Sequence, residues 1–374
     1  MNVGSGPLRI VVLGLSLSSS WGNGHATTYR ALLKALSARG HDILFLERDV
    51  PWYASTRDLP SPDYCTLDLY SSLADLERRR NEIASADLVV VGSYVPEGIA
   101  VGRFVQATAR GITAFYDIDT PVTLAALEAG ECNYLSEPII GGYDLYLSFT
   151  GGPVLDHIER RYGVPAARAL YCSADIDAYA PSPKPFRWDL SFLGTYSADR
   201  QAALHRLLIE PARRARHLRF AVAGAQYPND TLWPENVERI DHVPPDQHPA
   251  FYSASRFTLN VTRGEMVRAG YSPSVRLFEA AATGTAIISD AWPGLDTIFQ
   301  PDREIIIAIR PEDVLAALLS IPGSRRRRLA QAARRRVLAN HSAERRAIEL
   351  ETYLGEIARE RIQPAPSVPI SKFA

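Results

Sequence analysis

The repeated alternation of short apolar runs with helical patterns constrains the fold of this chain more than any other feature. In the first half we predict strands at "RIVVLGL", "DILFLE", "DLVVVGS", "ITAFYDI" and "DLYLSF". The first two flank an amphipathic helix over residues 27–39, which Gly40 ends. The alternation resumes with "WDLSFLG", "LRFAVAG", "VERI", "RFTLNV", "TAIISD" and "EIIIAI". Strands that alternate with helices are typical of parallel α/β sheets.

Two such sheets are expected, because 374 residues exceed the length that one ordinary core can organise. Three prolines between positions 181 and 185 indicate an interdomain linker. We therefore predict two Rossmann-like α/β domains that face each other across a cleft, with a C-terminal helix closing back toward the first domain. The predicted N-terminal domain, linker, C-terminal domain, and final helix with its tail span residues 1–180, 181–185, 186–342 and 343–374.

The composition is that of a soluble globular protein, with 46% hydrophobic and 22% charged residues. The formal net charge of -1 provides no global field that would attract nucleic acid, so no nucleic-acid partner is expected. The arginine-rich stretch at residues 325–336 is interpreted as a solvated helix face. Three widely spaced cysteines, Cys65, Cys132 and Cys172, fit no metal-ligand spacing and indicate thiols in a reducing compartment.

The apolar stretch "LRIVVLGLSLSSS" near the N-terminus has the length of a signal-peptide core. It runs directly into a turn, an amphipathic helix and a second strand-like run, which a first strand explains and a signal peptide does not. No run approaches the roughly 20 apolar residues that a membrane span requires. We therefore expect a cytoplasmic protein without an integral membrane segment.

Ligands of parallel sheets bind at the carboxyl ends of the strands, where glycine turns and helix N-termini expose N–H groups. In the second half, Gly194 ends one strand-like run and Gly224 ends the next. Arg200 follows Gly194 after one helical turn and has the planar donor set that binds phosphates in a bidentate way. Each turn alone is a generic strand–glycine–helix connection, and the phosphate interpretation depends on what accompanies it.

The stretch "SPSVRLFEAAATGTAIISD", which begins at Ser272, adds further residues that suit a nucleotide ligand. Ser272 suits an N-cap, and Pro273 or Ser274 suits a helix start. Arg276 and Glu279 then share one helix face, where a carboxylate can accept from a ribose diol and a guanidinium can clamp phosphates. The alternative is an i,i+3 ion pair on a surface helix. The alanine-rich body favours a buried helix, in which an idle ion pair is costly.

The segment "SVRLFEAAATGTAIISDAWPGLDTIF" resembles the donor-binding motif of GT-B glycosyltransferases, most closely the CgeB-like (spore-maturation-type) group. The resemblance implies an N-terminal acceptor domain and a C-terminal nucleotide-sugar donor domain. It places Glu279 on the donor ribose, Gly194 and Arg200 at the diphosphate, and "HVPPDQHPAFYSAS" beside the nucleobase. Retaining families carry an earlier Glu that contacts the donor sugar, and the equivalent position here is Tyr271. The sugar and the stereochemistry therefore stay open.

The loop "SSSWGNGHATTYR" follows the first strand, so Trp21, Gly24 and His25 should lie on the acceptor side of the cleft. In inverting GT-B enzymes a His after a Gly in this loop is the general base, which the resemblance transfers to His25. A neutral imidazole can take a proton from an attacking hydroxyl. The alternative is a His that caps the following helix or binds the donor phosphates.

The segment "AFYDIDTPVTL" places Asp117 and Asp119 at the end of another strand, hence also in the cleft, with Asp117 on the acceptor side. Asp119 could orient His25, could itself be the base, or could form a metal-binding D-x-D with Asp117. The resemblance to GT-B enzymes, which generally work without a metal, argues against the metal site. A helix N-cap ahead of Pro121 is the remaining alternative for Asp119.

Together these features predict transfer of a sugar from a nucleotide diphosphate sugar to the hydroxyl of a small-molecule or glycan acceptor. UDP is the favoured nucleotide, and the hexosyltransferase type is expected. No metal and no cofactor beyond the nucleotide-sugar co-substrate is expected, because arginines and helix N-termini would stabilise the leaving diphosphate. Two alternatives remain open, a nucleotide-sugar epimerase and a non-catalytic nucleotide-sugar-binding protein of a surface or spore-coat assembly.

Overall fold

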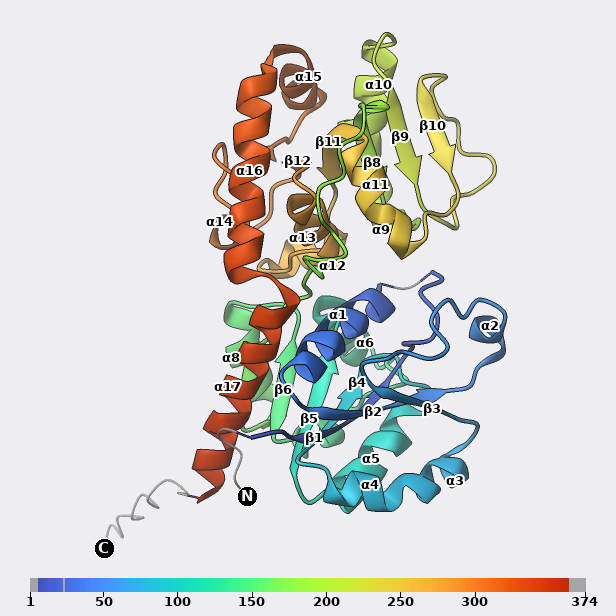
Figure 1. The fold of residues 1–374 in the computed structure, drawn as a ribbon, viewed down its shortest axis with the longest axis vertical. Helices are drawn as coiled ribbons and strands as arrows, with labels where there is room; N and C mark the ends of the chain where they lie inside the picture. Colours follow the sequence, from blue (N-terminus) through green and yellow to red (C-terminus); the bar gives the residue numbers. More distant parts are fainter. Residues whose placement is uncertain (1–5, 23, 363–374) are drawn as a thin grey trace, which may run out of the picture.

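The computed structural model describes residues 6–22 and 24–362, and it contains two parallel sheets with helices on both faces of each (Figure 1). The N-terminal sheet has the order β3-β2-β1-β4-β5-β6-β7, and the C-terminal sheet has the order β10-β9-β8-β11-β12-β13. The N-terminal strands are β1 (Arg9–Gly14), β2 (Asp42–Arg48), β3 (Thr66–Tyr70), β4 (Leu88–Gly92), β5 (Ile112–Asp117), β6 (Leu145–Ser148) and β7 (Ala167–Ala169). The C-terminal strands are β8 (Trp188–Leu193), β9 (Phe220–Ala223), β10 (Val237–Ile240), β11 (Ser255–Asn260), β12 (Ala286–Ser289) and β13 (Ile306–Ile307). The predicted pair of parallel α/β domains is therefore present.

Helices cover the N-terminal sheet because each strand presents apolar side chains on both faces. On one face α1 packs against β1, β2 and β4 through Tyr29, Leu32 and Leu36, while α4, α5 and α8 pack on the other. Helix α1 begins at His25, two residues before the predicted start. The N-terminal helices are α1 (His25–Ala38), α2 (Pro51–Ala54), α3 (Leu73–Leu76), α4 (Arg80–Ser85), α5 (Gly98–Thr108), α6 (Thr120–Glu128), α7 (Glu137–Ile140) and α8 (Pro153–Tyr162).

The C-terminal sheet is likewise enclosed, by α11, α13 and α16 on one face and by α9, α10 and α15 on the other. A π-helical segment, His205–Ile209, joins α9 to α10. Among the residues described, no helix is long and apolar enough to cross a membrane. The remaining helices are α9 (Ala198–Leu204), α10 (Glu210–Arg214), α11 (His248–Ser253), α12 (Gly264–Ala269), α13 (Val275–Ala282), α14 (Leu295–Ile298), α15 (Pro311–Ser320), α16 (Gly323–Asn340) and α17 (Ala343–Ile362).

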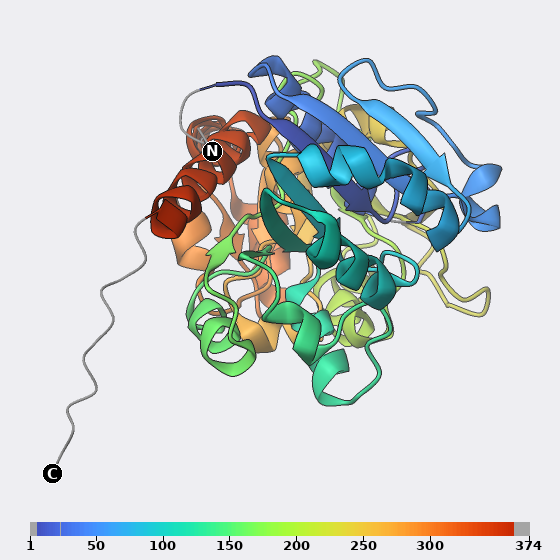
Figure 2. The same cartoon turned by 90° about the horizontal axis from the view of Figure 1, so that it is seen from below.

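Helix α17 returns to the N-terminal domain, as predicted. Leu350, Leu354 and Ile357 of this helix join the same core as α1, and both views show α17 along one side of that domain (Figures 1 and 2). The chain crosses between the domains twice, and the two crossings are bonded to each other, since the Ala343 N–H donates to the Ala174 carbonyl at 3.2 Å. The domains are therefore held by paired connections as well as by their contact surface.

Candidate functional site

A cavity of about 300 Å³ lies between the carboxyl ends of the two sheets, where the sequence predicts the ligand. Its walls come from the loop after β1, from the turns after β8 and β9, from α11 and from α13. The structure thus brings together six of the predicted site residues from both domains. These six are Gly24, Gly194, Arg200, Gly224, Arg276 and Glu279.

Two glycines let the turns after β8 and β9 lie against each other at the cavity wall. Gly224 has a φ of +145°, and a Cβ at this position would lie 2.1 Å from the carbonyl oxygen of Gly194. A Cβ at Gly194 would lie 2.7 Å from Nη2 of Arg276. Any larger residue would therefore displace backbone or the guanidinium, and the glycines leave space for a ligand to approach.

Arg276 is the most buried cation of the cavity, with 7% of its surface exposed. Its Nε donates to the Leu193 carbonyl and its Nη1 donates to Asn260 Oδ1 at 2.9 Å. Ser274 also donates to Asn260 Oδ1, at 2.7 Å, and is the N-cap of α13. These partners of Arg276 are neutral, and no carboxylate within the described residues forms an ion pair with it. The negative charge of Asp290 acts on Arg276 but is linked to it only through Asn260, so the guanidinium has no direct ion-pair partner among the described residues.

Arg200 brings a second guanidinium to the same place. The guanidinium carbons of Arg200 and Arg276 lie 5.8 and 4.7 Å from the centre of the Phe192 ring. Arg200 Nη2 donates to the Thr195 carbonyl at 3.1 Å, and its buried Nε has no hydrogen-bond partner among the described residues. Burial, followed by repulsion from Arg276, lowers the pKa of Arg200 to about 10. Carboxylates act on these cations only at a distance, Asp199 on Arg200 and Asp290 on Arg276. Two adjacent guanidiniums without a direct ion pair among the described residues are therefore available to an anion.

Glu279 lines the same cavity, yet it does not pair with Arg276, so the surface ion-pair alternative is wrong. The carboxylate is 3% exposed and accepts from the hydroxyls of Tyr179 and Tyr252 at 2.9 and 3.1 Å. Burial would raise the pKa of Glu279, but His248 and the two hydroxyls outweigh it and hold the pKa below its ordinary value. Glu279 is therefore an ionised acceptor at neutral pH.

The helix that carries these residues begins later than predicted. Helix α13 starts at Val275 with Ser274 as its N-cap, so the prediction of Ser272 as the N-cap is wrong. The Ser272 hydroxyl lies instead 2.6 Å from that of Thr150 in the other domain. The segment before α13 is thus a domain contact, which fixes its backbone outside the helix.

Tyr271 belongs to the same contact and is absent from the cavity wall. Its φ of +49° is in the left-handed region, and its ring packs against Gly152 and Gly294, where an added Cβ would lie 2.5 and 2.4 Å from ring carbons. Its carbonyl accepts from the Gly151 N–H at 2.9 Å. The aromatic ring therefore fills the space between domains at the position where the related motif carries Glu.

His25 is the first residue of α1 and lies beside the cavity, whose wall includes its neighbours Gly24 and Thr27. The imidazole contacts the Tyr94 ring edge-on at 5.4 Å, and its buried Nδ1 has no partner among the described residues. Desolvation lowers the pKa of His25 to about 4, so the imidazole is neutral at pH 7. Trp21, on the same loop, is 42% exposed.

Asp119 does not orient His25, and that prediction is wrong in the described structure. The carboxylate accepts from the Tyr94 hydroxyl at 2.9 Å and from Arg263 Nη1 at 3.2 Å, so Tyr94 stands between the two predicted catalytic groups. Burial raises the pKa of Asp119 despite Arg263. Asp119 is also the N-cap of α6, although its side chain caps no N–H.

Asp117 is a structural residue, in contrast to its predicted position on the acceptor side. It is fully buried and accepts from Tyr146 at 2.6 Å and from Thr123 at 2.7 Å. Burial raises its pKa to about 6. Because both oxygens of Asp117 are held inside the sheet layer, it does not face Asp119 as a metal-binding pair would. The described residues contain no group of three or more acidic, His or Cys side chains arranged for a metal ion.

Four residues of this region were missed from the sequence. His248 and Tyr252 lie in the segment that was singled out for the nucleobase, so the signal was present but not assigned to residues. Tyr179 precedes the linker, and Arg263 follows β11, where it pairs with Asp199 at 3.8 Å as well as with Asp119. Tyr179 carries no motif, whereas Arg263 ends the stretch "LNVTR", which fits the same family resemblance but was assigned no role.

Comparisons with known proteins concern the sequence family of the C-terminal part and the fold of the whole chain. Residues 200–352 match the family described as glycosyl transferase-like, and no curated protein matches the sequence. Among solved structures, sucrose-phosphate synthase from Thermosynechococcus elongatus aligns with a TM-score of 0.64 at 15% identity over 95% of this chain and 99% of that one. Anabaena Alr3699/HepE in complex with UDP and glucose gives 0.66 at 11% identity over 93% and 100%.

An α-glucosyltransferase in complex with UDP-glucose and DNA gives a TM-score of 0.70 at 11% identity over 94% of this chain and 100% of that one. These identities are low, so the likeness establishes the fold. The predicted fold class of two facing α/β domains is confirmed. The C-terminal part of the chain is therefore glycosyl transferase-like in sequence, and the chain as a whole has the GT-B fold of glycosyltransferases.

Proposed function

We propose that this protein transfers a hexose from a UDP-sugar to the hydroxyl of an acceptor without a metal ion, and that it does so in the cytoplasm. The observation that carries the proposal is the pair of Arg200 and Arg276 beside the Phe192 ring at the wall of the cleft, neither of which has an ion-pair partner within the described residues. An anion with two adjacent phosphoryl groups matches two adjacent guanidiniums. The matched family and the UDP-containing neighbours support a nucleotide sugar over other diphosphates. Three free cysteines support the reducing compartment.

In this proposal the diphosphate lies against the Gly194 turn, and the ribose lies over Glu279. An ionised carboxylate has about four lone-pair positions. Two are used by Tyr179 and Tyr252, so Glu279 keeps the capacity to accept from both hydroxyls of a ribose diol. As the bond to the sugar breaks, negative charge grows on the diphosphate, and Arg276 and Arg200 stabilise it in place of a divalent cation.

His25 remains the proposed general base, and Asp119 holds Tyr94, whose ring packs against the imidazole. A pKa of about 4 makes the imidazole a weak base in the free protein. A bound diphosphate adds negative charge nearby and therefore raises the pKa of His25 toward neutrality. Donor binding would thus prepare the base, which ties proton removal to the presence of the sugar donor. We also propose that the chain belongs to the CgeB-like group of these enzymes.

The test is nucleotide binding followed by analysis of the product. UDP and UDP-glucose should raise the melting temperature more than GDP or dTDP, with about 2.7 kcal/mol of stabilisation when the ligand is at 100 times its Kd. Arg276→Gln should abolish this shift, whereas the matched control Arg325→Gln, an exposed arginine on α16, should preserve it. A protein that none of these compounds stabilises would refute the proposal.

Incubation with the UDP-sugar then separates the alternatives. Slow release of free sugar and UDP supports a transferase, and interconversion of the sugar supports an epimerase. Binding without turnover, even after acceptors have been supplied, supports a non-catalytic binding protein.

A further inference from the structure

Two exposed tryptophans of the N-terminal domain lie on connected segments, Trp21 on the loop after β1 and Trp52 on the short helix α2. Trp21 follows β1 and is 42% exposed, and Trp52 follows β2 and is 57% exposed. Trp21 stands between Ser20 and Gly22, both of which line the cavity. Isolated apolar residues are common on surfaces, but two exposed indoles on segments that are hydrogen-bonded to each other, one of them flanked by cavity-lining residues, are unusual.

Hydrogen bonds join the loop that carries Trp21 to the segment that carries Trp52. The backbone N–H of Trp21 donates to Ser19 Oγ at 3.3 Å, and Ser19 Oγ donates to the Thr56 carbonyl at 2.9 Å. Thr56 Oγ1 in turn lies 3.4 Å from the Trp52 carbonyl. The backbones that carry the two indoles are therefore connected through two side chains.

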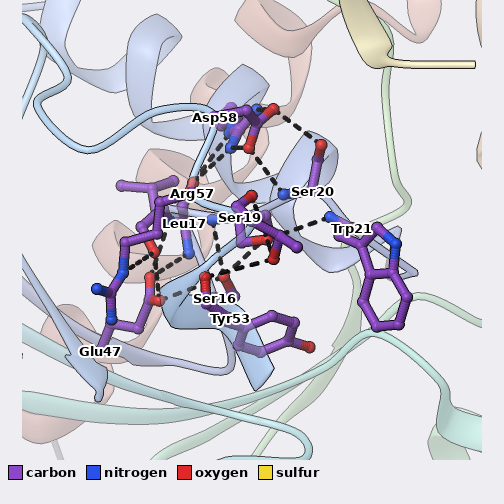
Figure 3. Close-up of polar contacts among 12 residues, drawn as sticks. Ser16, Leu17, Ser19, Ser20, Trp21, Glu47, Tyr53, Arg57 and Asp58 are labelled. Carbon is purple, nitrogen blue, oxygen red and sulfur yellow. Dashed lines mark hydrogen bonds and ion pairs between the residues drawn. The ribbon is translucent and has the colours of Figure 1, made fainter. Parts of the chain in front are cut away.

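The buried carboxylate of Glu47 holds the loop after β1 through several hydrogen bonds. Glu47 is fully buried and accepts from Leu17 N at 2.7 Å, from Ser18 N at 2.8 Å, from Ser18 Oγ at 2.6 Å and from Ser16 Oγ at 3.3 Å (Figure 3). Figure 3 shows the indole of Trp21 extending from the edge of this network. A carboxylate that is satisfied by backbone donors keeps the loop in one conformation, so the indole is presented with little entropy left to lose on binding.

The charges around the loop are balanced. Arg30 pairs with Asp58 at 2.7 Å, and Asp58 also accepts from Ser20 N at 2.9 Å (Figure 3). Arg57 pairs with Asp49. Recognition of a polyanion such as DNA requires cations that are available to its phosphates. The basic residues of this rim already have carboxylate partners, which favours a neutral ligand.

We propose that Trp21 and Trp52 form an acceptor subsite that stacks on the rings of a neutral glycan. The inference rests on the proposed sugar transfer and names the class of acceptor. The apolar C–H face of a pyranose packs on an indole, while its hydroxyls remain in water at the rim or face the cavity. An acceptor ring placed on Trp21 would present its hydroxyl to the neighbouring Gly24 and His25 side of the cleft.

The test measures the binding of two neutral linear hexasaccharides to the full chain in saturating UDP. One is built of glucose units and the other of N-acetylglucosamine units. Trp21→Ala and Trp52→Ala should each weaken this binding by about tenfold, since the stacking contact is lost. Trp52→Phe should retain most of it. The matched control Leu319→Ala, which removes another 57%-exposed apolar side chain, should leave it unchanged.

The parallel measurement of UDP affinity separates the two proposals. If UDP binds but neither hexasaccharide does at millimolar concentration, the acceptor subsite is refuted and the sugar-transfer proposal stands. The same holds if binding survives both alanine substitutions, or if only a single-stranded oligonucleotide or a uronic-acid hexamer binds. Failure of UDP itself to bind would instead refute the proposed function.

Discussion

The substitution Glu279→Gln tests the donor site most directly. The side chain keeps its size, but the amide offers one acceptor oxygen where the carboxylate offers two. Tyr179 and Tyr252 already occupy one position on each carboxylate oxygen, so at least one ribose bond is lost with the charge. A hydrogen bond to a charged group contributes about 1.5–3 kcal/mol. The Kd for UDP should therefore rise by about 10- to 100-fold.

Calorimetric titration with UDP and with 2′-deoxy-UDP isolates the ribose contact from general damage to the fold. The wild-type protein should prefer UDP by about tenfold, and in Glu279→Gln that preference should fall close to one. Glu304→Gln is the matched control, because Glu304 is also buried in the same domain, where it pairs with Arg336 at 3.2 Å outside the cavity. If Glu279→Gln prefers UDP over 2′-deoxy-UDP by the same factor as the wild-type protein does, the carboxylate does not bind the ribose.

Other predictions concern the glycine turn and the histidines. Gly224→Ala should lower the melting temperature and abolish UDP binding because its Cβ meets backbone, whereas Gly355→Ala in α17, with no neighbour within 4 Å, should stabilise by about 0.5–1 kcal/mol. Stability should fall as the pH drops below 6.5, because burial lowers the pKa of His341 to about 3 and that of His25 to about 4, and the unfolded chain binds these protons first. His341 alone should contribute about 2 kcal/mol of the loss by pH 5, and urea titrations should show the loss shrink by that amount in His341→Gln. His25→Ala should retain UDP affinity and lose transfer, and near-normal turnover in a coupled UDP-release assay would exclude it as the base.

The sequence predicted the elements whose apolar pattern is supported by burial on both faces. Strand β4 is buried throughout and was predicted within one residue at its start. Strands β3 and β7 were missed because they are edge strands. Each has a neighbour on one side only, and β3 is largely half-buried or exposed, so neither needs the continuous apolar run that marks a central strand.

The burial of Arg276 and Glu279 at the cavity was predicted because a buried helix limits what a charged residue can do. The alanine-rich body of α13 requires burial, and buried Arg276 and Glu279 must then have partners or a ligand. The identity of those partners could not be predicted. Tyr179 reaches Glu279 from 100 positions earlier in the chain, and no local pattern encodes that contact.

The acceptor side shows why the two aspartates after β5 could not be distinguished. Asp117 and Asp119 are two residues apart where β5 ends, so the direction of each side chain depends on the turn that follows the strand. Asp117 turns into the sheet layer, whereas Asp119 meets Arg263 from the other domain, 144 positions away. That pairing joins the two domains, and its loss would leave a buried carboxylate without its cation. Arg263 also lies close enough to Arg200 to lower the pKa of Arg200. If a diphosphate binds at Arg200 as proposed, it would attract the same guanidinium, and the contact between the domains would then respond to the charge of the donor.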